Sequence, residues 1–230
     1  MYAYILCGGF GTRLRSVLKD TQKAAVDIHG RPFLALVLAQ LREAGVSRGV
    51  LCAHYRADQL AALLPALEAE SGLSLQLVVE DTPLGTGGAL LNALIHVPPG
   101  TRYLVLNADT FLQSGAYRLA LEDERDVLVG VQVEDRSRYG SVRCSAQGEV
   151  LGFEEKGQSG PGWVNAGVYG LTAGALEGLP VSNCSMEQDL LPSLIRQQRL
   201  YLRQYSGAFV DIGTPDSLDA FRSDLRGSAI

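Results

Sequence analysis

The stretch Tyr2-Ala3-Tyr4-Ile5-Leu6-Cys7-Gly8-Gly9-Phe10-Gly11-Thr12-Arg13 decides the expected fold. It begins with a short apolar run, which is typical of a buried parallel strand, and the run stops at two glycines. Because glycine lacks a Cβ, backbone N–H groups after this strand can approach an anion closely, and Arg13 and Lys23 bring positive charge. The stretch therefore predicts a strand that opens onto an anion-binding loop.

Helices and strands alternate through the rest of the first half. After Pro32, apolar residues recur at helical spacing up to Gly45. Further strands are expected at Gly49 to Ala53, Leu73 to Val79 and Tyr103 to Leu106, and further helices near Ala57 to Ala69 and after Thr86. Such alternation predicts a sheet with helices on both faces.

The second half is richer in β structure. Two short runs around Gln147-Gly148 predict a hairpin within Ser141 to Phe153. Other strands are expected at Val127 to Val133 and Trp163 to Leu171, and helices near Met186 to Gln198 and Pro215 to Leu225 bracket a final strand pair, with Thr214 as N-cap. We expect one α/β domain over residues 1–230, a Rossmann-like three-layer αβα fold with a mixed, mostly parallel sheet and a small antiparallel insertion.

Composition and charge exclude several classes of protein. With 230 residues and 47% hydrophobic content, the chain can close one core without disulfides or structural metals. Its net charge of -5 is spread along the sequence without a basic block, so nucleic acid is not an expected partner. The four cysteines lack metal-ligand spacing and predict reduced, buried thiols. Without a signal peptide or a membrane-length apolar run, a soluble, cytoplasmic protein is expected.

The glycine loop matches neither of two well-known nucleotide-binding motifs. It is not GxGxxG, and no Gly-Lys-Ser/Thr ends it as in a P-loop. From these residues alone, a glycine-rich turn without a ligand remains an alternative.

The sequence from Leu6 to Leu14, followed by Lys23, resembles the signature of the sugar-1-phosphate nucleotidylyltransferases, GGxGTRL and then a lysine between two prolines. The resemblance implies that Arg13 binds the outer phosphates of a nucleoside triphosphate and that Lys23 lies at the phosphates undergoing exchange. The residues implied to surround the nucleotide in this loop are Leu6, Gly8, Gly9, Gly11, Thr12 and Arg13. Gln22 and Ala24 replace the two prolines, which predicts a looser loop around Lys23.

Two aspartates are candidate metal ligands. Asp109 follows the strand ending at Leu106, and Asp211 lies in Phe209-Val210-Asp211-Ile212-Gly213-Thr214-Pro215. Open α/β sheets bind ligands at the carboxyl ends of their strands, and Mg²⁺ bound to phosphates needs only one or two protein carboxylates. Either residue alone could be a helix N-cap or a loop aspartate. Their motifs resemble the family's L-x-G-D and D-x-G-T-P segments, which implies that Asp109 and Asp211 hold Mg²⁺.

The resemblance also implies a sugar site and a base site. The residues implied to bind the sugar phosphate are Gly140, Glu155, Lys156, Asn165 and Gly167, although a solvated Glu/Lys pair is the alternative for two of them. Glu80 to Gly88 resembles the base-reading segment, with backbone groups of Gly85 at the base edge. Guanine presents N1–H and an amino group side by side, so a carboxylate at Glu80 could accept both, which favours GTP. Glu80 could equally be a surface acid.

The implied reaction is in-line attack of a sugar 1-phosphate oxygen on the α-phosphorus of the triphosphate, which releases pyrophosphate. Mg²⁺, Arg13 and Lys23 would offset the developing charge, so Arg13, Lys23, Asp109 and Asp211 are the expected catalytic residues. The histidines His29, His54 and His96 lie outside the matched motifs and are expected to have no catalytic role.

Within the family, the segments Pro83 to Ala89, Asn107 to Phe111 and Arg138 to Gly140 resemble those of the D-glycero-α-D-manno-heptose 1-phosphate guanylyltransferases. Residues 1–112 would form the nucleotide-binding half and 113–230 the sugar-binding half, with no C-terminal β-helix domain and with a homodimer possible. Open alternatives are a mannose-1-phosphate guanylyltransferase, a uridylyl- or cytidylyltransferase, and, from other classes, a glycosyltransferase or a non-catalytic sensor of sugar nucleotides. A glycosyltransferase would more often show a DxD motif, and Asn107-Ala108-Asp109 offers only its second acid.

Overall fold

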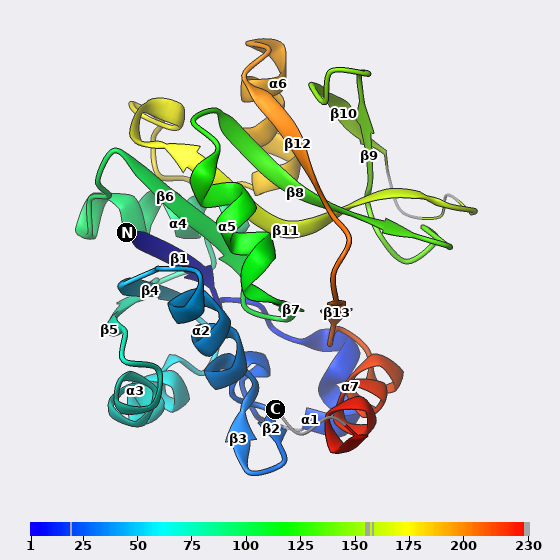
Figure 1. Cartoon of the computed structure of the whole chain (residues 1–230). Helices are drawn as coiled ribbons and strands as arrows, with labels where there is room; N and C mark the ends of the chain where they lie inside the picture. The colour runs from blue at the N-terminus through cyan, green and yellow to red at the C-terminus, as the bar shows by residue number, and fades with distance from the viewer. Residues whose placement is uncertain (19, 155–156, 158, 228–230) are drawn as a thin grey trace.

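The computed structural model describes residues 1–18, 20–154, 157 and 159–227 (Figure 1). The strands of its main sheet are β1 (Tyr2–Leu6), β4 (Arg48–Ala53), β5 (Ser74–Val79), β6 (Arg102–Asn107), β8 (Asp126–Val133), β9 (Ser141–Cys144), β10 (Val150–Glu154), β11 (Gly162–Thr172) and β12 (Leu200–Tyr205). They follow the order β10-β9-β11-β6-β1-β4-β5, with β8 beside β11 and β12 beside β8. The parallel neighbours are β6, β1, β4 and β5, together with the pair β8 and β12.

Helices cover both faces of this sheet (Figure 1). The covering helices are α2 (Phe33–Glu43), α3 (Ala57–Ser71), α4 (Gly85–His96), α5 (Ser114–Glu122) and α6 (Leu191–Arg196). Two others, α1 (Arg15–Leu18) and α7 (Pro215–Gly227), lie away from the main sheet, and α7 packs beside β13 (Phe209–Asp211) (Figure 1). Successive side chains of a strand point to opposite faces. Accordingly Ala3 and Ile5 of β1 belong to one core cluster with residues of α2, α3 and α5, whereas Tyr4 belongs to a second cluster with residues of α4 and α6. The predicted three-layer αβα fold is confirmed.

The strand β1 sets the position of the glycine loop. It lies between β4 and β6, parallel to both, with Leu6 opposite Cys52 on one side and Asn107 on the other. Because the carboxyl ends of parallel strands meet at one edge of a sheet, the loop from Gly8 and the turn that holds Asp109 start side by side.

The predicted antiparallel insertion is also present. The strands β9 and β10 pair as a hairpin, and β11 runs antiparallel to both β6 and β8. The pairing of β11 with β8 is irregular between Asn165 and Tyr169. Within this irregularity Gly167 has φ +70, and a Cβ there would lie 2.5 Å from Nδ2 of Asn107. Glycine is needed here because both the backbone conformation and the close side chain disfavour any larger residue.

One sequence-based expectation needs correction, and another is refined. The last two strands form but do not pair with each other, because β12 extends the main sheet beside β8 while β13 (Phe209–Asp211) leaves it to pair with β7 (Thr110–Leu112). The helical stretch expected near Met186 to Gln198 is present, and it consists of a π-helical turn, Met186–Leu190, followed by α6. Thr214 does precede α7, and its Oγ1 accepts a 3.3 Å hydrogen bond from the N–H of Ser217.

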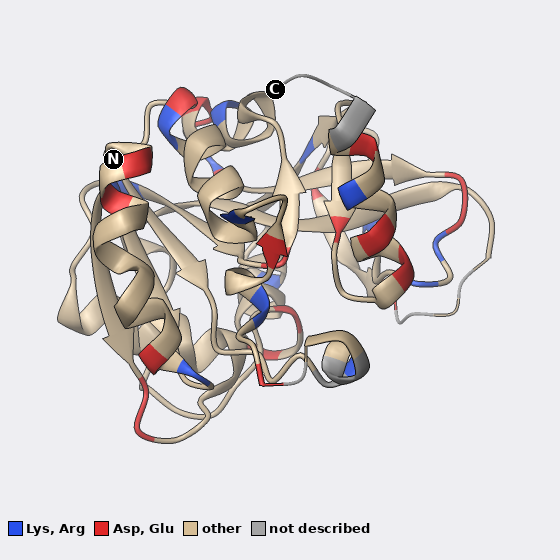
Figure 2. Ribbon diagram, turned by 90° about the horizontal axis from the view of Figure 1, so that it is seen from below, with Lys and Arg blue, Asp and Glu red and all other residues tan. Residues whose placement is uncertain are grey.

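Several short elements carried no clear sequence signal. The hairpin of β2 (Asp27–Ile28) and β3 (Arg31–Pro32), the strand β7 and the helix α5 were not expected. None of the helices within the described ranges is long and apolar enough to cross a membrane. Figure 2 shows acidic and basic residues interspersed over the helices and loops.

Candidate active site

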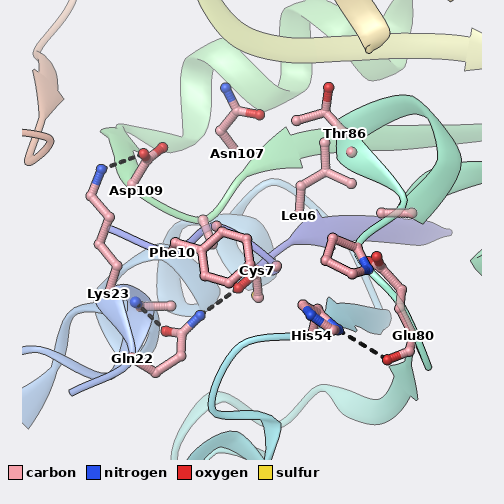
Figure 3. Close-up of a pocket in the computed structure, with 17 residues that line it drawn as sticks. Leu6, Cys7, Phe10, Gln22, Lys23, His54, Glu80, Thr86, Asn107 and Asp109 are labelled. Atoms are coloured by element: carbon pink, nitrogen blue, oxygen red, sulfur yellow. Dashed lines mark hydrogen bonds and ion pairs between the residues drawn. The ribbon is translucent and has the colours of Figure 1, made fainter. Parts of the chain in front are cut away.

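A first cavity of about 290 Å³ opens beyond the carboxyl ends of β1, β4 and β6 (Figure 3). The residues expected in the site that line it are Leu6, Gly8, Gly9, Lys23, Glu80, Gly85 and Asp109. Figure 3 shows Lys23 and Asp109 at one end and Glu80 with His54 at the other. The cavity therefore runs from a basic and acidic pair to a separate buried carboxyl group.

A second, larger cavity of about 750 Å³ adjoins the first. The residues expected in the site that line it are Arg13, Asp109, Gly140, Asn165, Gly167 and Asp211. Asn107 and Asp109 line both cavities, so the two spaces meet at the turn after β6. A reaction between two bound molecules would take place at this junction.

The glycine loop contributes to both cavities, but not through every expected residue. Gly8 packs against Glu80, since a Cβ on this glycine would lie 3.3 Å from Oε1 of that carboxyl group. Arg13 is exposed and lines the second cavity instead of the first. Gly11, with φ +58, lines neither cavity, and the side chain of Thr12 lies outside what the structure describes.

Lys23 is joined directly to Asp109. It begins a short 3₁₀ turn, Lys23–Ala25, and its Nζ forms an ion pair with Oδ2 of Asp109 across the junction of the cavities. Its side chain is only 12% exposed. The preceding residue Gln22, which stands where the family has a proline, is buried and hydrogen-bonded through both ends of its side-chain amide.

Asp109 has a second effect on its surroundings. Burial, assisted by the charge of Asp109, raises the pKa of the Cys7 thiol well above its ordinary range. Cys7 is therefore a neutral thiol, and a neutral thiol is neither a nucleophile nor a metal ligand.

The strands β7 and β13 bring the two predicted metal ligands together. Asp211 stands opposite Thr110 in this pair, and the N–H of Ile212 donates a 3.0 Å hydrogen bond to the carbonyl of Asp109. Both aspartates line the second cavity. Asp211 accepts a 2.6 Å hydrogen bond from the N–H of Gly213 through Oδ1. Carboxylate oxygens of this kind suit Mg²⁺, which usually binds one or two protein carboxylates together with water and phosphate oxygens.

Glu80 is a buried acceptor at the far end of the first cavity. It is 6% exposed, and its Oε2 accepts a 2.8 Å hydrogen bond from the N–H of Leu84. Its Oε1 is buried without a hydrogen-bond partner among the described residues. Burial raises the pKa of Glu80, an effect opposed by the Leu84 N–H and by His54. A buried carboxyl oxygen left unpaired fits a ligand that donates N–H groups.

A loop from the second half of the chain packs against the segment that follows Glu80 and is hydrogen-bonded to it. The carbonyl of Cys184 accepts hydrogen bonds of 2.9 and 3.3 Å from the N–H groups of Gly87 and Gly88, and Met186 donates a 2.9 Å bond to Oγ1 of Thr86. At Gly85, with φ +70, a Cβ would lie 2.5 Å from the same Cys184 carbonyl. The glycines of this segment thus let the two halves of the chain approach closely.

A hydrogen-bonded network forms one wall of the second cavity. Asn165 accepts a 2.9 Å bond from the N–H of Gly167 and donates a 2.7 Å bond to the hydroxyl of Tyr169. That buried hydroxyl donates to Oε1 of Glu187 at 3.0 Å, and Oε2 accepts a 3.2 Å bond from Ser185. Glu187 lines the cavity beside the expected sugar-binding residues. Sequence reasoning missed it because a single acid on an expected helix belongs to no motif.

Some expected site residues lie outside the described part of the chain, and other residues line the first cavity without having been expected there. Glu155 and Lys156, expected to bind the sugar phosphate, lie outside the described residues. His54, which was given no role, lines the first cavity, and its Nδ1 lies 3.1 Å from the backbone carbonyl of Glu80. Phe10 also lines that cavity and packs edge-on against His54.

Residues 2–227 match the nucleotidyl transferase family, so the chain belongs to that family. The expected enzyme class, a nucleotidylyltransferase, is confirmed. The chain is 31% identical over 216 residues to a D-glycero-alpha-D-manno-heptose 1-phosphate guanylyltransferase of Campylobacter jejuni, covering 94% of this chain and 96% of that protein. It is 33% identical to the mannose-1-phosphate guanylyltransferase catalytic subunit beta of Drosophila pseudoobscura, covering 93% of this chain but 59% of that protein.

Solved structures agree with these relationships. HddC from Yersinia pseudotuberculosis superposes with a TM-score of 0.86 at 33% identity, covering 97% of this chain and 98% of that chain. The structure of HddC complexed with GMP-PN superposes with a TM-score of 0.84 at 32% identity, with the same coverage. A putative glucose-1-phosphate thymidylyltransferase from Bacillus anthracis shares the fold, with a TM-score of 0.83 at 19% identity over 100% of this chain and 97% of that one.

Proposed function

We propose that this chain transfers GMP from GTP to D-glycero-α-D-manno-heptose 1-phosphate and releases pyrophosphate. The observation that carries the proposal is the meeting of two cavities at Asn107 and Asp109, one ending at a buried carboxyl group and the other lined by polar residues suited to a sugar. The similar guanylyltransferase of Campylobacter jejuni, matched over 96% of its own length, supports this choice of substrates.

The choice of GTP is supported by Glu80. Guanine carries two adjacent donors, N1–H and the amino group, and an ionised carboxylate is purely an acceptor. Oε1 of Glu80 has no partner among the described residues, and Oε2 already accepts one N–H from Leu84 but has a second lone pair. Uracil and thymine present one donor between two carbonyls, and those carbonyls would face the carboxylate unfavourably.

The triphosphate would then extend toward Lys23 and Asp109. Lys23 lies beside the junction, where its charge would offset the negative charge that develops as the α-phosphorus is attacked. Arg13 lines the second cavity and would meet phosphate from that side. Positioning and electrostatic stabilisation can supply nearly all the rate of such a transfer, so no protein nucleophile is required.

Asp109 and Asp211 would hold Mg²⁺, as their shared cavity and oxygen donors allow. When bound, the ion would supply further charge stabilisation to the phosphate oxygens.

The sugar is assigned to the second cavity. Asn165 is held in orientation by Gly167 and Tyr169, and Glu187 is held by Tyr169 and Ser185. Each of these two side chains retains hydrogen-bonding capacity beyond those bonds and faces the cavity, which suits the hydroxyl groups of a sugar.

A pyrophosphate-release assay with a panel of substrates tests the proposal. Purified chain and Mg²⁺ would be combined with GTP, UTP, CTP or dTTP and with heptose, mannose or glucose 1-phosphate. We expect the highest kcat/KM with GTP and the heptose phosphate. If activity were highest with mannose 1-phosphate, the proposed sugar substrate would be mannose 1-phosphate instead of the heptose phosphate. Activity only with UTP or CTP would contradict the assignment of GTP as the nucleotide.

A further inference from the structure

The side chain of Gln22 joins two loops that the proposed reaction must hold in register. Gln22 is 1% exposed and lies in the wall of the first cavity, between the glycine loop and the turn that carries Lys23 (Figure 3). Its Nε2 donates a 2.5 Å hydrogen bond to the carbonyl of Cys7, the residue before Gly8. Its Oε1 accepts a 2.5 Å bond from the N–H of Ala24, the residue after Lys23.

The backbone of Gln22 is anchored separately. Its N–H donates a 2.7 Å hydrogen bond to Oε1 of Gln59 on α3, and Nε2 of Gln59 donates a 3.0 Å bond to the carbonyl of Asp20. Gln22 therefore fixes Lys23 from three directions: to the strand end through Cys7, to its own turn through Ala24, and to α3 through Gln59.

A proline at this position could make none of these bonds. Proline has neither a backbone N–H nor a polar side chain, and it restrains a loop by fixing φ. Where Gln22 takes this place, its side chain adds hydrogen bonds to both sides of the turn, and it makes them in a buried position where an unmade bond is costly.

We propose that Gln22 is a positioning residue that holds Lys23 at the junction of the two cavities, in place of the rigidity that a proline would give. It does not touch the reacting atoms. Its effect reaches them through Lys23, whose Nζ pairs with Asp109. The expected effect of Gln22 on the reaction rate rests on the proposed nucleotidyl transfer. Its effect on the position of Lys23 does not depend on that proposal.

The test replaces Gln22 by methionine, which has a similar length and neither donates nor accepts these bonds strongly. Misplacing a reacting group by about 1 Å can cost about 100-fold in rate, so Gln22→Met should lower kcat by about 10- to 100-fold, with a smaller change in KM for GTP. The matched control is Gln76→Met on the exposed face of β5, which should leave kcat unchanged. Thermal unfolding of both variants establishes that they are folded.

A double-mutant cycle separates positioning from general destabilisation. If Gln22 acts through Lys23, adding Gln22→Met to a Lys23→Ala variant should lower kcat by less than about twofold further. A full additional loss of 10-fold or more in the Lys23→Ala background would overturn the proposal.

A spectroscopic readout does not depend on turnover. The sequence has three lysines, Lys19, Lys23 and Lys156, so ¹³C-dimethylation of lysine side chains gives few NMR signals, and Lys23→Arg assigns one of them. We expect Gln22→Met to shift the Lys23 signal and Gln76→Met to leave it in place. An unchanged Lys23 signal in folded Gln22→Met would contradict the proposal. If the wild-type chain transferred no nucleotide, the proposed function would fail while this measurement still decided the role of Gln22.

Discussion

Asp109 and Asp211 face one cavity although they come from opposite halves of the chain. The pairing of β7 with β13 brings them together, and the hydrogen bond from the Ile212 N–H to the Asp109 carbonyl joins the two segments directly. The site therefore forms only when the last short strand has returned to the turn after β6.

Asp211→Asn tests the second carboxylate of this pair. Asparagine keeps the size of the side chain and an oxygen for the Gly213 N–H, but it removes the negative charge. We expect kcat/KM to fall by at least about 100-fold and the Mg²⁺ concentration for half-maximal rate to rise, because the proposed metal ligand is weakened. Asp219→Asn on α7 is the control, since that side chain is 71% exposed and lies outside the site.

Glu80→Gln should change the preference between bases. Glutamine presents one acceptor and one donor, which no longer matches the two adjacent donors of guanine but does match an N–H beside a carbonyl in uracil or thymine. The ratio of kcat/KM for GTP to that for UTP should fall by about 10- to 1,000-fold, the range expected when paired buried groups are mismatched. An unchanged ratio would remove Glu80 from base recognition.

The raised pKa of Glu80 predicts a pH dependence for GTP binding. Below that raised pKa the carboxyl group is protonated and can no longer accept both guanine donors. The KM for GTP should therefore increase as the pH falls through this range, and the KM of Glu80→Gln should not follow it. Steady-state kinetics with a constant sugar phosphate concentration would check this.

The raised pKa of Glu80 also predicts that its contribution to the stability of the fold is larger at low pH, whereas its contribution to GTP binding is larger at high pH. A carboxyl group whose pKa is higher in the folded state stabilises the fold below its unfolded pKa, and this contribution is lost as the pH rises through the folded value. Glu80→Gln should thus become more stable relative to the wild type as the pH rises from about 4.5, the ordinary pKa of glutamate, toward neutrality. Denaturant unfolding of both proteins across that pH range would measure the difference in free energy of unfolding. If Glu80 were ionised throughout, the wild type would instead gain stability relative to Glu80→Gln as the pH rises.

Glu187→Gln tests the network in the second cavity. The amide keeps one acceptor oxygen but puts a donor where either Tyr169 or Ser185 donates, so the side chain should turn or lose one bond. We expect the KM for the sugar phosphate to rise by about 10-fold, with the KM for GTP unchanged. A rise confined to GTP would place Glu187 with the nucleotide instead. Glu122→Gln, at the end of α5 and outside both cavities, is the matched control.

Most of the fold could be predicted because its signals are local. The apolar run before Gly8, the helical spacing after Pro32 and the turn at Gln147-Gly148 each indicated an element that is present. The pairing of β13 with β7 could not be predicted in this way, since a three-residue strand has no periodicity and its partner is distant in sequence.

The site was predictable where residues belong to short motifs and not where they act through tertiary contacts. Lys23, Asp109 and Asp211 could be named from the sequence, and the structure brings all three to the edge of the second cavity or its junction. Glu187 and His54 reach the cavities only through the packing of their elements. The proposed role of Gln22 could not be predicted either. In the sequence this residue only marks a missing proline, and its hydrogen bonds to Cys7 and Ala24 exist only once the loops are folded.

The central claim is that transfer takes place where the two cavities meet, at Asp109. Asp109→Ala measured for pyrophosphate release with GTP, heptose 1-phosphate and increasing Mg²⁺ tests it most directly, with Asp219→Ala as the control. We expect kcat/KM to fall by at least about 100-fold at every Mg²⁺ concentration, because both the proposed metal ligand and the partner of Lys23 are lost. Full Mg²⁺-dependent turnover by folded Asp109→Ala would contradict the account.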